Sequence, residues 1–600
     1  MNSGIVFFPP EVKEIQLEST RYAGQLMLLY AAKFLGCIDA ASIIDVTNDN
    51  SEYSNERIYL TNFLSIASGK QRLSHVDELI HKEFKAVCGG NYPQKSCNHA
   101  YLDKVVEEDQ RLIEEGQESI IQGFMDNTTK GYLGAGILNG ENLYMDKHVV
   151  ELCTEKSIAK DQHALRNTVV KAINEYRVIC SDTRTTVTSW FLNAGHSFSD
   201  LLKPAIDKVK SLTGKSVKLL GVDKGAYNYD KLTKAAEETG ACIAIWSKDT
   251  QTTIESLVAV PEELFEVYET ETIQYLTGEE EIVKTRIADA GEITIDKHGH
   301  KVRAVAIRNE ETSRRIGILV FGRRCFEYNK YQIADFLYGK QDIENCFKER
   351  KKYGGDKFCG GIFKNREEKA VSQEELDKMG RKLKLLKNRI PRLKSDIEKY
   401  TELLSKGELG KRDYNRLAKK AQKDKERLEF EQKNLETKIE SRDLNEKIRH
   451  TLDTRKITIV ACIQDHVITC KRYILDKATG IMKELLSQKL NQLGYLSTDE
   501  IDIKVQKQLK SLNMQKISAR LFEQGGCIYK DNITNEYVVI MKNYENSLMQ
   551  GTYEKLCVEF ANMEVMLESG KRHYRLVFMT ESSFEEKYAI GSKVKVKIAV

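Results

Sequence analysis

The sequence has few of the residues that build flexible linkers and no apolar run long enough to cross a membrane. Only six of its 600 residues are proline and 37 are glycine, which argues against long disordered connections. The most apolar early run, AGQLMLLYAAKFLG (23–36), is too short to span a bilayer and contains Lys33. It predicts a buried helix, and we expect no membrane partner.

The chain also lacks a large net charge and a disulfide pattern. The formal charge is only +4 although 30% of residues are charged, which excludes a polycation and leaves room for local basic surfaces. Its 13 cysteines follow no framework spacing. With no signal peptide ahead of them, we expect free thiols in a reducing cytoplasm.

Changes of hydrophobic pattern divide the chain into four predicted domains. Helical spacing of apolar residues predicts an N-terminal helical domain over 1–130. Strands alternating with helices predict an α/β domain over 135–362, and within it residues 250–325 predict a mostly antiparallel β insert. Residues 446–600 predict a last α/β region. Short apolar runs predict strands at ESLVAV (255–260), ITIVACI (457–463), YVVIMKN (537–543) and YRLVFMT (574–580).

Residues 366–445 have the pattern of a coiled coil. Apolar residues alternate by three and four positions from Leu376 to Leu404, and a second set begins at Tyr414 after a turn. We expect a basic antiparallel helical hairpin, about 50 Å long at 1.5 Å per residue. Pro391 should kink or break its first helix. The hairpin is either a solvated spacer or an arm that grips DNA.

Two aspartates interrupt or end apolar strands in the α/β domain. Asp146 lies within NLYMDKHVVEL (142–152), where a carboxylate is costly to bury unless it is paired or binds a metal. Asp223 ends the strand in LLGVDKG (219–225). Residues at the carboxyl ends of strands line the ligand crevice of open α/β sheets. Both aspartates are therefore candidate site residues.

A glutamate lies among lysines on a later helix, in DFLYGKQDIENCFKERKKYGGD (335–356). At 3.6 residues per turn, Lys340, Glu344, Lys348 and Lys351 share one face. This face is either solvated and rich in ion pairs or a phosphate groove with a metal-binding carboxylate in it. If Glu344 meets the two aspartates, the three oxygens suit Mg²⁺ or Mn²⁺ ions, and the lysines would neutralise DNA phosphates.

Other residues compete for these roles. Asp182, in CSDTR, could replace Asp146 as the first ligand, and Asp342 could replace Glu344, although it lies off the lysine face. Trp246 follows the strand CIAIW and is either part of the core or a platform for a flipped base.

Three segments together resemble the motifs of the insertion-sequence DDE transposases. They are LYMDKH (143–148), GVDKGAYN (221–228) and QDIENCFK (341–348), around the two aspartates and the glutamate. The subgroup has a ribonuclease-H-like core interrupted by a β insert and a Tyr-Arg-Glu-Lys signature. By that spacing, Lys351 matches, whereas Lys340 and Leu337 stand where the family has Arg and Tyr. Lys224 likewise replaces an Arg.

The resemblance implies a DNA transposase, an enzyme that cleaves element ends and transfers the 3′-hydroxyls to target DNA. It implies two Mg²⁺ or Mn²⁺ ions per active site, double-stranded DNA with terminal inverted repeats as partner, a homodimer on DNA, and a place in the prokaryotic cytoplasm at the nucleoid. The implied catalytic and metal residues are Asp146, Asp223 and Glu344, and the implied DNA contacts are Lys224, Lys340, Lys348 and Lys351. A metal-dependent nuclease without strand transfer and a catalytically weak DNA-binding or scaffolding protein are the alternatives.

Overall fold

The computed structural model has mixed α/β architecture, and its contacts divide it into two compact units. The first holds the described residues of 1–151, 161–362 and 453–600, and the second those of 152–160 and 363–452. The described ranges are 14–47, 51–154, 158–163, 168–273, 280–310, 313–353, 362–366, 373–408, 410–440, 449–492, 498–510, 514–561, 563–569, 572–588 and 595–599.

The N-terminal part of the first unit is mainly helical, as predicted. Ser54 and Ser119 cap two of its helices by accepting backbone N–H groups of the first turn. The helices are α1 (Met27–Phe34), α2 (Cys37–Ala41), α3 (Asn55–Ala67), α4 (His81–Val87), α5 (Lys95–Glu114) and α6 (Ile120–Gly134). The helical prediction is wrong at Glu14–Thr20, which forms strand β1.

A ten-stranded sheet follows in the order β3-β4-β2-β6-β7-β11-β10-β9-β8, with β5 paired to β4. Strands β2, β6 and β7 run parallel, whereas β4–β5, β2–β4 and all pairs from β7 to β8 are antiparallel. The strands are β2 (Asn142–Glu151), β3 (Lys160–His163), β4 (Thr168–Cys180), β5 (Thr186–Asn193), β6 (Leu219–Val222), β7 (Cys242–Trp246), β8 (Glu266–Ile273), β9 (Glu280–Thr294), β10 (Lys301–Asn309) and β11 (Arg315–Phe321).

Strands β8 to β11 supply the β-rich segment predicted within 250–325. The strand predicted at 255–260 is wrong, because Gln251–Val258 forms a helix, α9. Thr250 caps that helix, its hydroxyl accepting the N–H of Thr253 at 3.2 Å. The other helices of this region are α7 (Leu202–Thr213), α8 (Tyr229–Thr239), α10 (Lys330–Gly339) and α11 (Gln341–Lys352).

The C-terminal part holds a second sheet in the order β16-β17-β15-β14-β1-β18. The strands predicted at 537–543 and 574–580 are confirmed as β15 and β17. The strand predicted at 457–463 is wrong, since it begins the long helix α14. The elements are α14 (Arg455–Gln492), α15 (Thr498–Lys510), α16 (Met514–Phe522), β14 (Gly526–Asp531), β15 (Glu536–Met541), α17 (Ser547–Ala561), β16 (Met566–Ser569), β17 (Arg572–Thr580), α18 (Glu581–Lys587) and β18 (Lys595–Ala599).

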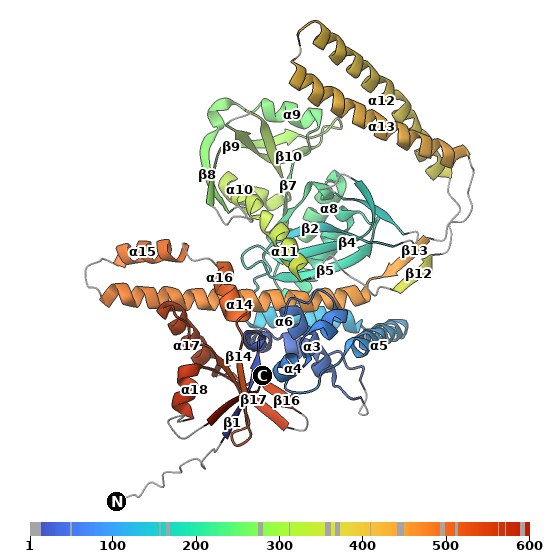
Figure 1. Ribbon diagram of the computed structural model, residues 1–600. Helices are drawn as coiled ribbons and strands as arrows, with labels where there is room; N and C mark the ends of the chain where they lie inside the picture. The colour runs from blue at the N-terminus through green and yellow to red at the C-terminus, as the bar shows by residue number, and fades with distance from the viewer. Residues whose placement is uncertain are drawn as a thin grey trace, which may run out of the picture. The chain divides into compact units, whose positions relative to one another are not determined.

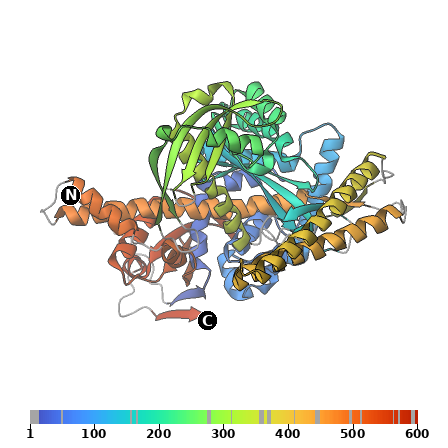
Figure 2. The same cartoon turned by 90° about the horizontal axis from the view of Figure 1, so that it is seen from above.

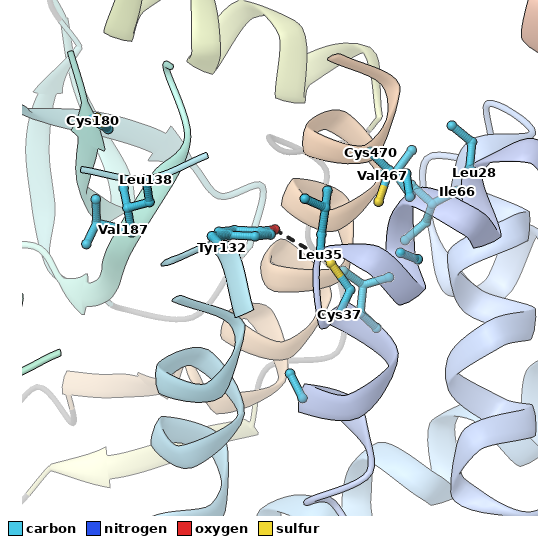
Figure 3. Close-up of a cluster of buried hydrophobic side chains, with 14 of the residues drawn as sticks. Leu28, Leu35, Cys37, Ile66, Tyr132, Leu138, Cys180, Val187, Val467 and Cys470 are labelled. Atoms are coloured by element: carbon cyan, nitrogen blue, oxygen red, sulfur yellow. Dashed lines mark hydrogen bonds between the residues drawn. The ribbon is translucent and has the colours of Figure 1, made fainter. Parts of the chain in front are cut away.

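Helix α14 runs through the first unit as a single rod (Figures 1 and 2). Its buried side chains join the hydrophobic core of the N-terminal helices and of the ten-stranded sheet. Figure 3 shows residues of all three regions in this cluster: Leu28, Leu35, Cys37, Ile66, Tyr132, Leu138, Cys180, Val187, Val467 and Cys470. The N-terminal helices, the ten-stranded sheet and α14, which are far apart in the sequence, therefore share one hydrophobic core. The predicted domain boundaries stay predictions.

The second unit holds two helices in the range where the heptad pattern predicts them, α12 (Gln373–Ser405) and α13 (Lys411–Glu440). Leu386, Ile390 and Leu428 are buried between them. Pro391 lies inside α12, so the expected break is wrong. Strands β12 (Ile362–Arg366) and β13 (Arg449–Asp453) pair with each other.

Two further expectations concern the whole chain. The cysteines within the described ranges carry free thiols, as predicted. None of the described helices combines the length and the apolar character that a bilayer crossing requires.

Candidate functional site

The register of two parallel strands brings the predicted aspartates together. Met145 of β2 is level with Val222 of β6. The next residues along the chains, Asp146 and Asp223, therefore come side by side at the carboxyl edge of the sheet. Asp146 is almost buried, with a side chain 12% exposed, whereas the side chain of Asp223 is 51% exposed.

A lysine ammonium lies between the two carboxylates. Lys340 Nζ donates to Asp146 Oδ2 at 3.1 Å and lies 3.9 Å from Asp223 Oδ1. The Lys340 side chain is only 7% exposed. It reaches the sheet from the junction of α10 and α11, where its backbone is helical (φ −56°, ψ −23°). The two carboxylates thus share one buried cation.

Helices α10 and α11 cover the face of β2 that carries Asp146. Side chains two apart on a strand share a face, so Tyr144, Asp146 and His148 point the same way. Tyr144 donates its hydroxyl to the Phe336 carbonyl of α10 at 2.7 Å. The ring of His148 stacks on Phe347 of α11, with centroids 4.9 Å apart. Contacts on both sides of Asp146 thereby fix the helix pair over it.

Burial acts on the protonation of Asp146. Loss of water around the carboxyl raises its pKa above the ordinary value, and the neighbouring charge of Asp223 acts in the same direction. The Lys340 ammonium opposes both effects. The ammonium therefore offsets part of the effect of burial on Asp146.

Glu344 lies on the same side of α11 as Lys340, one helical turn further on, and its side chain is exposed. Within the described ranges, no group of three or more His, Cys, Asp and Glu side chains is arranged to hold a metal ion. The structure therefore brings Asp146 and Asp223 together and places Glu344 nearby on the covering helix. Metal binding by all three stays a prediction.

The lysines predicted to contact DNA have different surroundings. Lys224 and Lys348 are exposed and Lys351 is partly buried. Lys340 is buried, so the interpretation of one solvated lysine face from 340 to 351 is wrong at its first member. A contact of these lysines with phosphate stays a prediction.

The competing residues lie elsewhere or outside the description. Asp182 is exposed in the turn after β4. Because Cys180 is level with Leu143, that turn lies at the opposite edge of the sheet from Asp146. Trp246 packs edge-on against Tyr338, with centroids 5.6 Å apart, beside a buried cluster. The side chain of Asp342 lies outside the described residues.

Sequence reasoning missed a buried group of four charges beside this site. Arg350 of α11 donates to Asp465 of α14 at 2.7 and 3.1 Å, and also to Glu175 of β4. Arg177, opposite Asp146 on β4, donates to Asp465 and lies 3.4 Å from Glu175. All four side chains are less than 10% exposed. Charges inside the apolar runs NEYRVIC and ACIQDHVITC are the signal that could have revealed it.

More contacts tie the end of α11 to α14. Arg472 pairs with Glu349, and Gln464 donates its amide to the Tyr353 carbonyl at 2.8 Å. The helix that carries Glu344 is therefore held by the sheet at its start and by α14 at its end.

Comparisons with known proteins find a weak likeness among solved structures. No protein-family model matches the chain, and no curated protein matches its sequence. One solved structure that is similar is the piggyBac transposase synaptic complex with hairpin DNA, with a TM-score of 0.29 and 8% identity. The match covers 56% of this chain and 70% of that chain. A TM-score this low carries no weight for fold or function.

Proposed function

We propose that the protein is a DDE-type DNA transposase that acts through Asp146, Asp223 and Glu344. One observation carries the proposal: Asp146 and Asp223 flank a single cationic atom at the carboxyl edge of parallel strands. Two acidic oxygens around a positive charge form the beginning of a site for a hard cation. The ammonium of Lys340 now contacts these carboxylates, which would supply the hard oxygen donors that a metal needs.

The arrangement of strands supports the ribonuclease-H-like core. Strands β5, β4 and β2 are antiparallel neighbours, and β6 and β7 continue from β2 in parallel. Strands β8 to β11 lie between β7 and α10 in the chain. This is the interval between Asp223 and Glu344, where the resembling family has its β insert.

Each residue has a defined role in the proposal. Asp146 and Asp223 would hold the metal ions, and Glu344 would be a third ligand from α11. When bound, two Mg²⁺ or Mn²⁺ ions would activate a water or a 3′-hydroxyl and stabilise the leaving oxygen of the phosphodiester. The exposed ammonium groups of Lys224 and Lys348 neutralise phosphates beside the metals. Two copies of the chain bring two DNA ends together.

The test is metal-dependent cleavage and joining on a duplex with the inverted repeats that flank the coding sequence. We expect the wild type to nick and join this DNA with Mg²⁺ or Mn²⁺. The variants Asp223→Asn and Glu344→Gln should lose both reactions while DNA affinity stays unchanged, because they remove a metal ligand and not a phosphate contact.

The matched control is Asp182→Asn, which removes an exposed carboxylate at the opposite edge of the same sheet. It should retain both reactions. Cleavage without joining would favour the metal-dependent nuclease. Binding without cleavage by every form would refute the enzyme and favour a DNA-binding or scaffolding protein.

A further inference from the structure

Lys340 has two carboxylates around its buried ammonium. Nζ lies 3.1 Å from Asp146 and 3.9 Å from Asp223, and the side chain is 7% exposed. The neighbouring Lys147 pairs with Asp161 at 2.8 Å in the usual one-to-one way. Around Lys340 there are two carboxylates for one ammonium, whereas the ion pair of Lys147 is with one carboxylate.

A divalent ion would compete with the ammonium for this place. Mg²⁺ binds carboxylate oxygens at roughly 2.0–2.1 Å. An ion bound by both aspartates would therefore compete with Nζ for the same two carboxylates. The two cations would also repel each other strongly in a region with little water. Binding of a metal should therefore be weakened while Lys340 contacts the two aspartates.

An ammonium that leaves this position must be stabilised elsewhere, by water or by another anion. Lys340 is the N-cap residue of α11, one turn before the exposed Glu344 and two turns before the exposed Lys348. A return to water is open to it, but a DNA phosphate at this edge offers a negative partner. DNA would then favour the form in which the two carboxylates are free for metal.

We propose that Lys340 is a built-in counter-ion that occupies the metal position until bound DNA draws its ammonium away. This inference rests on the proposed function, since it concerns metal and DNA at the same site. DNA binding would then determine whether the two aspartates are available to bind a metal ion. Metal and DNA bind with positive coupling, and by linkage each raises the affinity for the other.

The first experiment uses the full chain and Mn²⁺ alone, with free Mn²⁺ followed by its electron paramagnetic resonance signal. Lys340→Met should bind Mn²⁺ at least about tenfold more tightly than the wild type, a factor that corresponds to about 1.4 kcal/mol. Lys340→Arg should bind it no more tightly than the wild type, because a guanidinium also neutralises the aspartates. Adding Asp146→Asn to Lys340→Met should remove the gain.

The matched control is Lys147→Met, which removes the same charge one residue from Asp146. Because side chains alternate along a strand, Lys147 points to the opposite face of β2. The Lys147→Met variant should bind Mn²⁺ with an affinity within about twofold of the wild type, well below the tenfold gain expected for Lys340→Met. Equal gains in both methionine variants would show a general charge effect and overturn the proposal.

The second experiment needs no variant, so it decides even if Lys340→Met does not fold. A 40-base-pair duplex should raise the Mn²⁺ affinity of the wild type. An unchanged affinity would overturn the inference. If Mn²⁺ binds equally tightly to the wild type and to Lys340→Met, only the role of Lys340 fails. If Mn²⁺ binds to no form, with or without DNA, the proposed metal chemistry fails with it.

Discussion

Replacing Asp465 by Asn should strongly destabilise the first unit. Asp465 is the acceptor that Arg177 and Arg350 share, and both guanidinium groups are only 2% exposed. The substitution keeps the size of the side chain and removes its charge. Two buried arginines would then face Glu175 as their only carboxylate in this cluster. One buried positive charge is left uncompensated.

Two physical arguments give the size of the loss in unfolding free energy for Asp465→Asn. Removing one partner of a buried ion pair costs about 3–5 kcal/mol of unfolding free energy. The pKa of Asp465 gives a lower figure: burial tends to raise it, but Arg177 and Arg350 outweigh burial and lower the pKa from 3.8 to about 2. At about 1.36 kcal/mol per pKa unit, this corresponds to roughly 2.5 kcal/mol at neutral pH.

The same pKa fixes the sign of the pH dependence. A carboxyl with a depressed pKa in the folded state stabilises the fold above its unfolded pKa. That contribution is lost as the pH falls from about 4 towards 2. The difference between wild type and Asp465→Asn should therefore shrink by about 1 kcal/mol on going from pH 7 to pH 3.

Urea denaturation of both forms at the two pH values checks this. The control is Asp207→Asn, which breaks an exposed i,i+4 pair with Lys203 whose side chains are 49% and 44% exposed. It should cost less than about 1 kcal/mol. If Asp465→Asn costs no more than this control, the buried network does not stabilise the fold in the way described.

Two further predictions concern other parts of the first unit. His466, buried between Tyr59 and Thr128, has a pKa lowered to about 3 by burial, so its contribution is complete above pH 6.5 and is lost as the pH falls towards 3. His466→Gln should flatten the dependence of unfolding free energy on pH between 6.5 and 4.5 by up to about 1.4 kcal/mol per pH unit, and an unchanged slope in urea titrations would contradict this. Gly131→Ala would place a methyl 2.4 Å from the Leu35 carbonyl, so it should cost about 1–3 kcal/mol in urea denaturation. Gly134→Ala in the same helix meets nothing within 4 Å and should be neutral or stabilising by up to about 1 kcal/mol, so equal losses would show that the close approach is not the cause.

Period-based patterns predicted most strands of the ten-stranded sheet, because these alternate apolar runs with clear turns. One of their failures is a helix that is largely buried along its first half. ITIVACI is rich in β-branched residues, yet it lies near the start of α14, where most residues from Lys456 to Cys470 are buried. A short apolar run cannot by itself distinguish a buried strand from part of a buried helix. β1 was missed because its partners lie at the far end of the chain.

The sequence likewise predicts one part of the candidate site and not the other. The two aspartates could be selected as candidates, since Asp223 ends an apolar strand, where open α/β sheets bind ligands, and Asp146 interrupts one. The position of Lys340 between them could not. It depends on which face of β2 the helices α10 and α11 cover, and Tyr144 and His148 settle that only through long-range contacts. Such packing has no signature in local spacing.

The position of β1 has a consequence for how the protein is made. Its partners on both sides, β14 and β18, are synthesised near the end of the described chain. At roughly 5–20 residues per second, Ile528 emerges from the ribosome roughly 25–100 s after its partner Glu18. Until then the strand exposes unpaired backbone on both edges. A nascent or prematurely released chain therefore carries an open aggregation site at its beginning, which a chaperone would have to cover.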